Sequence, residues 1–151
     1  MCLHESGHAV VAQAAGCEVR KVTAEELEDD VKIGFTDYEP PINITLHEQL
    51  WTDVGVLYGG KAAESIMGGR ESSKGILKDE QDIQKALSKL HALSSFNEQE
   101  QLARCEKLAR EIIGAHKGTL RRLSWHLSKR RVVQGRELHK ILQGIREGAH
   151  E

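Results

Sequence analysis

The sequence of 151 residues has few of the residues that mark several common protein classes. Its three cysteines are widely spaced and no two form a Cys-x-x-Cys pair, which argues against a disulfide framework or a cysteine zinc knuckle. Aromatic residues make up only 4%, so an aromatic platform for stacking nucleic-acid bases is not expected. With two prolines in the whole chain, the composition favours helix. We therefore expect one domain in a reducing, cytoplasmic compartment.

Long apolar runs and a large excess of one charge are also missing. No run approaches the eighteen or more apolar residues of a membrane span, and no charged and apolar leader precedes the motif that begins at His4. Lys and Arg number 21 against 23 Asp and Glu, giving a net charge of −2, which argues against a globally basic nucleic-acid binder. We expect a protein with no membrane span and no nucleic-acid partner.

The hydrophobic pattern predicts a mainly α-helical fold with one small β-hairpin. Apolar and polar residues alternate on either side of an acidic run at 25–30, which predicts the hairpin over 17–36. Apolar residues at helical spacing predict helices in most of the rest. The predicted helices cover residues 2–15, 46–67, 79–93, 97–128 and 134–146, with a Gly/Ser-rich loop at 68–78.

The run HESGH at residues 4–8 fits the pattern His-Glu-x-x-His on the first predicted helix. Residues four apart lie one turn apart on the same helix face, so the imidazoles of His4 and His8 can bind one Zn²⁺. Glu5 lies beside them and can act as the general base in metal-assisted hydrolysis of a peptide bond. We therefore predict His4 and His8 as metal ligands and Glu5 as the catalytic residue. A chance match is the alternative, and the helical apolar pattern around the motif argues against it.

Catalytic zinc usually has three protein ligands, so a third must come from further along the chain. The long metzincin motif would need Gly at position 11 and His at position 14, where this chain has Val11 and Ala14. Asp82 is favoured because it borders the apolar stripe of its helix, where an unpaired carboxylate is costly. Asp79 is interpreted instead as the N-cap of that helix. The candidates left open are His47, Asp53, Glu64, Asp79, Asp82 and His91, and Glu64 can alternatively orient a zinc imidazole or form a structural salt bridge.

Several segments together resemble the peptidase domain of the FtsH-type ATP-dependent zinc metalloproteases. The resemblance covers nearly the whole chain and is carried by residues 4–11, 20–23, 34–36, 57–64, 79–86, 109–113, 120–123 and 135–138. It places Asp82 where the family has its third zinc ligand, an aspartate. The resemblance implies a zincin-like zinc endopeptidase that cleaves unfolded proteins or peptides, assembled as a ring-like homo-oligomer such as a hexamer.

The sequence also departs from that family. We expect no AAA+ ATPase module and no membrane anchor, and residues 78–81 read KDEQ where the family has a small Thr/Gly/Ala/Ser-rich run. We therefore expect a stand-alone, ATP-independent peptidase-like domain over 1–151, with a zinc-site part at 1–95 and a C-terminal helical part at 96–151. The alternative is a catalytically inactive zinc-binding interaction or regulatory domain, although a structural zinc site would not need Glu5.

Two further patterns have simpler interpretations. Residues 55–61, GVLYGGK, fit most of a P-loop, but Ala62 follows them and offers no hydroxyl for Mg²⁺. We expect no nucleotide site there and interpret the small residues as close helix packing. Residues 117–136 carry seven cations and no acid, which suits a patch for RNA, a membrane surface or an acidic partner, or else a solvated helix face. The solvated face is the favoured interpretation.

Overall fold

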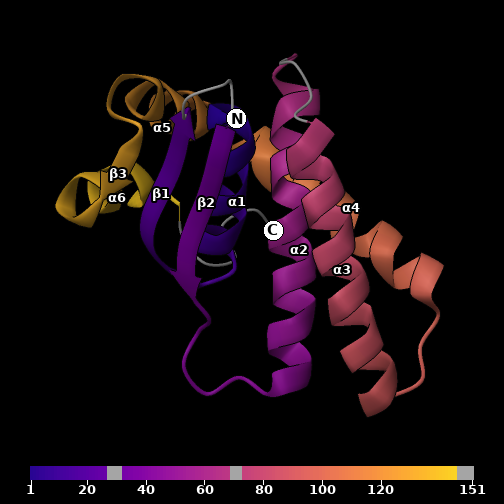
Figure 1. Cartoon of the computed structure of the whole chain (residues 1–151). Helices are drawn as coiled ribbons and strands as arrows, with labels where there is room; N and C mark the ends of the chain where they lie inside the picture. Colours follow the sequence, from indigo (N-terminus) through magenta and orange to yellow (C-terminus); the bar gives the residue numbers. More distant parts are fainter. Residues whose placement is uncertain (27–31, 69–72, 146–151) are drawn as a thin grey trace.

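The fold is mainly α-helical with a small antiparallel sheet, as the sequence predicts (Figure 1). The structure is a computed structural model, and it describes residues 1–26, 32–68 and 73–145. In chain order the elements are α1 (Cys2–Ala14), β1 (Glu18–Glu26), β2 (Lys32–Glu39), α2 (Leu46–Ile66), α3 (Ser73–Leu93), α4 (Glu98–Ala115), α5 (Lys117–Arg130), β3 (Val132–Gln134) and α6 (Gly135–Leu142). None of the described helices is both long and apolar enough to cross a membrane.

The three strands form a sheet in the order β2-β1-β3, with both neighbouring pairs antiparallel. The predicted hairpin is therefore present, and Thr23 of β1 lies opposite Phe35 of β2. Figure 1 shows the sheet lying against α1, with α2 and α3 side by side beyond it. Because β3 pairs with β1, the outer edge of β2 faces no other described strand.

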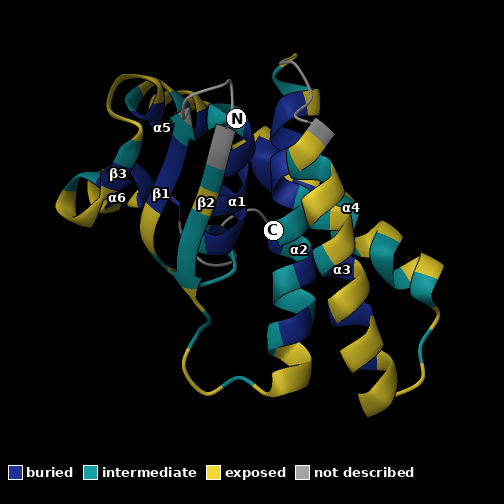
Figure 2. Ribbon diagram, viewed as in Figure 1, coloured by how far each residue is buried: buried dark blue, intermediate teal, exposed yellow. Residues whose placement is uncertain are grey.

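One hydrophobic core joins the two ends of the chain (Figure 2). Val10 of α1 and Val22 of β1 lie in the same buried cluster as Ile113 of α4, Leu123 of α5 and Leu138 of α6, and all five are fully buried. A smaller cluster joins α2 to α3. The segments 1–95 and 96–151 thus share a core, and α1 passes through its centre.

Two glycines allow α1 and α2 to pack backbone against backbone. A Cβ atom on Gly7 would lie 2.7 Å from the Cβ of Ala63, and one on Gly59 would lie 2.6 Å from the carbonyl oxygen of Gly7. Such distances are too short for real Cβ contacts, so both positions need glycine. The interpretation of residues 55–61 as close helix packing is confirmed, since the whole segment is part of α2. This contact brings α2 against the turn of α1 that carries the HESGH motif.

The structure differs from the predicted elements mainly in α3 and in the part of the chain that follows it. Helix α3 begins at Ser73, so residues 73–78, which composition assigned to a loop, are helical. The helix predicted over 97–128 is two helices separated at His116, with Gly118 close after the break. Arg131 has a left-handed backbone (φ 66°) that ends α5, and a short strand, β3, precedes a final helix that is shorter than predicted. Most of the acidic run predicted as a hairpin loop lies outside the described residues.

Candidate metal centre

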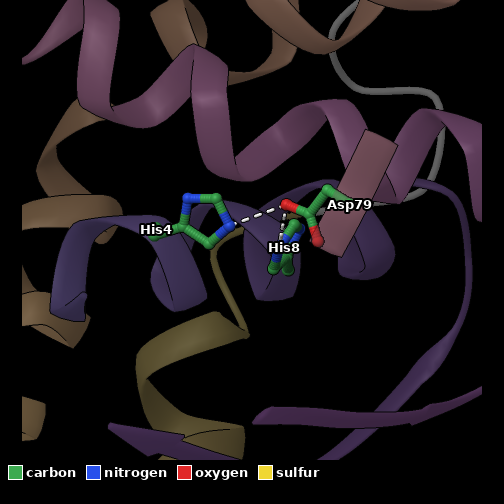
Figure 3. Close-up of side chains that lie close together, drawn as sticks. All are labelled: His4, His8 and Asp79. Atoms are coloured by element: carbon green, nitrogen blue, oxygen red, sulfur yellow. Dashed lines mark hydrogen bonds and ion pairs between the residues drawn. The ribbon is translucent and has the colours of Figure 1, made fainter. Parts of the chain in front are cut away.

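The motif on α1 and a carboxylate from α3 meet in one cluster (Figure 3). Nε2 of His4 lies 2.7 Å from Oδ2 of Asp79, and Nε2 of His8 lies 3.1 Å from the same oxygen. Both histidines are buried, and Asp79 is mostly buried. One donor atom from each of the three residues lies within 4.8 Å of the others. Residues 75 positions apart in the chain thus come into direct contact through groups that can bind a metal ion.

The other ring nitrogen of each histidine is held by α2. Nδ1 of His4 donates to Oε1 of Glu64, a carboxylate that is only 1% exposed. Nδ1 of His8 donates to the backbone carbonyl of Val56 at 2.7 Å. These contacts fix both ring orientations and direct each Nε2 towards Asp79. Metal-binding histidines almost always have such a carboxylate or carbonyl partner.

Strand β2 fixes the carboxylate of Glu5. Oγ1 of Thr36 donates to Oε2 of Glu5 at 2.8 Å and also lies 3.2 Å from the Glu5 carbonyl oxygen. Gly34 lets the strand pass close by, because a Cβ there would lie 2.8 Å from Cγ of Glu5. Glu5, His4, His8 and Asp79 all line one open pocket of about 620 Å³. The pocket is large enough to receive several residues of a peptide.

The structure brings Asp79, and not Asp82, to the two histidines. The N-cap interpretation of Asp79 is wrong, because α3 starts at Ser73 and Asp79 lies inside the helix. Three residues along a helix amount to about 4.5 Å of rise, so Asp82 lies further along the pocket face of α3, and it is not among the clustered donors. Asp82 lines the pocket wall, with its side chain 37% exposed and one oxygen 3.9 Å from Nζ of Lys85. Asp82 as a ligand stays a prediction that the geometry does not favour.

The remaining candidates for the third ligand have other partners. Glu64 is the partner of an imidazole Nδ1, one of the two roles that the sequence suggested for it. Asp53 accepts a hydrogen bond of 2.7 Å from the hydroxyl of Tyr38, and burial raises the pKa of this aspartate. His47 and His91 contact aromatic side chains and are not part of the cluster.

The cluster carries a strong local electrostatic field. Burial alone would lower the pKa of His8, but the hydrogen bond with Asp79, the charges of Glu5 and Asp79 and the Val56 carbonyl together raise that pKa to about 9. Burial would raise the pKa of Asp79, but its contacts with His4 and His8 lower it to about 2. Without a metal, the site therefore holds an imidazolium at His8 and a carboxylate at Asp79 at neutral pH.

The donor set fits a zinc ion. Two imidazole nitrogens and one carboxylate oxygen are a known set of protein ligands for catalytic zinc, which keeps a further position open. Ligand atoms around a tetrahedral zinc are about 3.3 Å apart, so the observed 2.7 and 3.1 Å would widen by about 0.6 and 0.2 Å, and all three donor atoms already lie within 4.8 Å of one another. The proton on Nε2 of His8 occupies the position that the metal would take.

The raised pKa of His8 predicts a pH-dependent zinc affinity. Zinc has to displace the His8 proton, so the apparent affinity should rise about tenfold per pH unit from about pH 6.5 to 8.5 and level off near pH 9. A histidine with the ordinary pKa of 6.5 would give a plateau above about pH 7 instead. Competition against a chromophoric chelator at several pH values measures this slope, and a flat profile above about pH 7 would contradict the prediction.

Gly60 of α2 gives a second prediction, because its missing side chain makes room for His4. A Cβ at Gly60 would lie 2.7–2.8 Å from three atoms of the His4 ring. Gly60→Ala should displace that imidazole and weaken zinc binding about 10- to 100-fold, the range found for disturbed partners of metal ligands. Gly55→Ala in the same helix is the matched control, because nothing lies within 4 Å of its Cβ position. Equal zinc affinity of the two variants, measured by chelator competition, would contradict the proposed contact.

The cationic stretch at 117–136 is partly compensated in the fold. Glu137, one residue beyond it, pairs with Arg130, and its other oxygen lies 3.1 Å from Nδ1 of His126. Nζ of Lys129 lies 5.9 Å from the ring centre of the exposed Trp125. The choice between a solvated helix face and a binding patch stays a prediction.

No protein-family model matches this chain, and no curated protein is significantly similar to it in sequence. The likeness to FtsH-type peptidases therefore rests on the segments quoted above and stays a prediction. The geometry of the cluster carries the functional argument instead. The His-Glu-x-x-His pattern predicts His4, Glu5 and His8. Thr36 and Gly60 lie in segments that carry the family resemblance, but no local pattern indicates their contacts with the site or that of the Val56 carbonyl.

Proposed function

We propose that this protein is a zinc metallopeptidase that hydrolyses peptide bonds in unfolded proteins or peptides. The observation that supports this most strongly is one arrangement: three zinc-type donors, His4, His8 and Asp79, share a pocket with the buried carboxylate of Glu5. A structural zinc site has no use for such a neighbouring base and is normally closed by four protein ligands. Here the three described donors face an open pocket.

Different residues of the site would have different roles in the hydrolysis of the peptide bond. A bound zinc ion would polarise the scissile carbonyl and make a water molecule more acidic. His4, His8 and Asp79 would hold the ion, with Glu64 and the Val56 carbonyl keeping the two imidazoles in place. Glu5 would accept a proton from the attacking water and deliver it to the leaving nitrogen, so that the carboxylate is regenerated after each cleavage.

Strand β2 supports an extended substrate. Residues 34–36 line the pocket beside Glu5, and the outer edge of β2 pairs with no other described strand. A peptide in extended form can add to such an edge through backbone hydrogen bonds. This binding mode suits an unfolded segment, because a folded domain rarely offers an extended strand that is free on both sides.

The proposal is tested by cleavage of fluorescently labelled, unfolded casein without ATP. The metal-free protein, prepared with a strong chelator, should be inactive, and activity should return in proportion to zinc up to one equivalent per chain. Circular dichroism before and after chelation controls for unfolding. A cleavage rate that does not depend on the zinc content would indicate a contaminating protease. A chain that binds one zinc and cleaves nothing would support the inactive zinc-binding domain.

A further inference from the structure

We propose that the pocket selects peptide segments with acidic side chains, and that Lys74 and Lys78 of α3 are the residues that select them. The inference rests on the proposed function and names the substrate class of that same site. The observations behind the inference concern the wall of the pocket opposite β2. That wall is formed by the part of α3 that the sequence assigned to a loop.

The pocket face of α3 carries two lysines beside the metal cluster. Lys74 and Lys78 line the same pocket as Glu5 and Asp79, and both lysines are exposed. Residues four apart lie one helical turn apart on the same face, with about 5–6 Å between their Cβ atoms. The two ammonium groups therefore lie on one flank of the pocket, where a side chain of a bound peptide can reach them.

The carboxylates of the pocket already have other partners. Asp79 contacts both histidines, and Glu5 accepts a hydrogen bond from a threonine of β2. Asp82 lies near Lys85, which is not among the pocket residues. Among residues that the structure describes, no carboxylate pairs with Lys74 or Lys78. When zinc balances Glu5 and Asp79, the two lysines and Asp82 leave one net positive charge among the residues that line the pocket.

The pocket surface formed by β2 and α2 is largely apolar, so an acidic side chain of a bound peptide would interact with the lysines on the α3 side. Phe35 of β2 is 52% exposed at the pocket, and Val56 and Leu57 add apolar surface on the α2 side. A peptide extended along β2 presents successive side chains to opposite sides. A carboxylate on the side facing α3 would meet two like charges that otherwise repel each other, whereas a basic side chain would add to that repulsion. The pocket should therefore favour Glu and Asp over Gln and disfavour Lys and Arg.

Binding and cleavage of matched peptides test this inference. At each position near the cleaved bond in turn, a set of three peptides would carry Glu, Gln or Lys and would otherwise be identical. Binding is measured by fluorescence anisotropy with the zinc-loaded Glu5→Gln variant, which should hold peptides without turning them over, and cleavage is measured with the wild type. The best-placed Glu peptide should bind and be cleaved about two- to tenfold better than its Gln counterpart at low salt, as expected for one or two exposed charge pairs. The advantage should shrink at high salt.

Charge-reversal variants identify the residues responsible. Lys74→Glu/Lys78→Glu should reverse the order so that the Lys peptide binds best, while Lys85→Glu, on the same helix but outside the pocket, should leave the order unchanged. All three positions are exposed, so the variants should fold, and circular dichroism verifies this. The same order in wild type and the double variant, or no measurable binding of any peptide, would overturn the inference. Charge-selective binding without cleavage would leave it standing and would count against the peptidase proposal alone.

Discussion

The substitution Asp79→Asn is expected to weaken zinc binding by more than about 100-fold, whereas Asp82→Asn should change it little. Disturbing a partner of a metal ligand already costs about 10- to 100-fold, so losing the charge of a ligand itself should cost more. The asparagine side chain would keep the shape of the aspartate but remove the negative charge that now faces both imidazoles. Peptidase activity at limiting zinc should fall in parallel.

Asp82→Asn is a closely matched control. The two aspartates lie three residues apart on α3, and both line the pocket. Zinc affinity is measured by competition with a chromophoric chelator, and circular dichroism verifies the fold of both variants. The reverse result, with affinity lost in the Asp82 variant and kept in the Asp79 variant, would assign the ligand to Asp82, as the FtsH resemblance implies. It would also mean that α3 binds the metal about one helical turn further along than this structure has it.

The two aspartates illustrate which parts of the site a local sequence pattern can predict. His4, Glu5 and His8 lie on one helix, so the helical period alone predicts their common face, and all three line the pocket. The third donor comes from a helix 75 residues away, and its position depends on where that helix begins and how it packs. The segment 73–75 has the composition of a loop, but it is the first turn of α3, and two of its three residues line the pocket.

The fold itself was predictable where an apolar stripe is strong. The ends of α1 and α2 match the predicted helices to within about one residue. Breaks were harder to predict, because the apolar pattern continues through His116, and only Gly114 and Gly118 on either side of it weaken the helix locally. Close contacts between elements, such as that of Gly60 with the His4 ring, could not be predicted, because they depend on residues far apart in the sequence.

Glu5→Gln is expected to lower kcat/KM for an unfolded substrate about 10²- to 10⁴-fold, the usual contribution of a positioned general base. Glutamine has nearly the same shape, so it can keep an oxygen within reach of the Thr36 hydroxyl, which now lies 2.8 Å from Glu5 Oε2. Zinc binding should be retained, because Glu5 is not one of the three clustered donors. An effect of this size with unchanged zinc content would separate proton transfer from metal binding.

Thr36→Val is the companion to this variant, because it leaves the carboxylate in place and removes the hydroxyl that contacts both the carboxylate and the backbone carbonyl of Glu5. It should reduce kcat/KM much less than Glu5→Gln does, by about tenfold, which corresponds to one hydrogen bond to a charged group of roughly 1.5 kcal/mol. Both variants are compared with wild type at equal zinc occupancy. Equal cleavage by wild type and Glu5→Gln would remove Glu5 from the mechanism. Background cleavage by both, with zinc bound in each, would instead identify the chain as a zinc-binding domain without turnover.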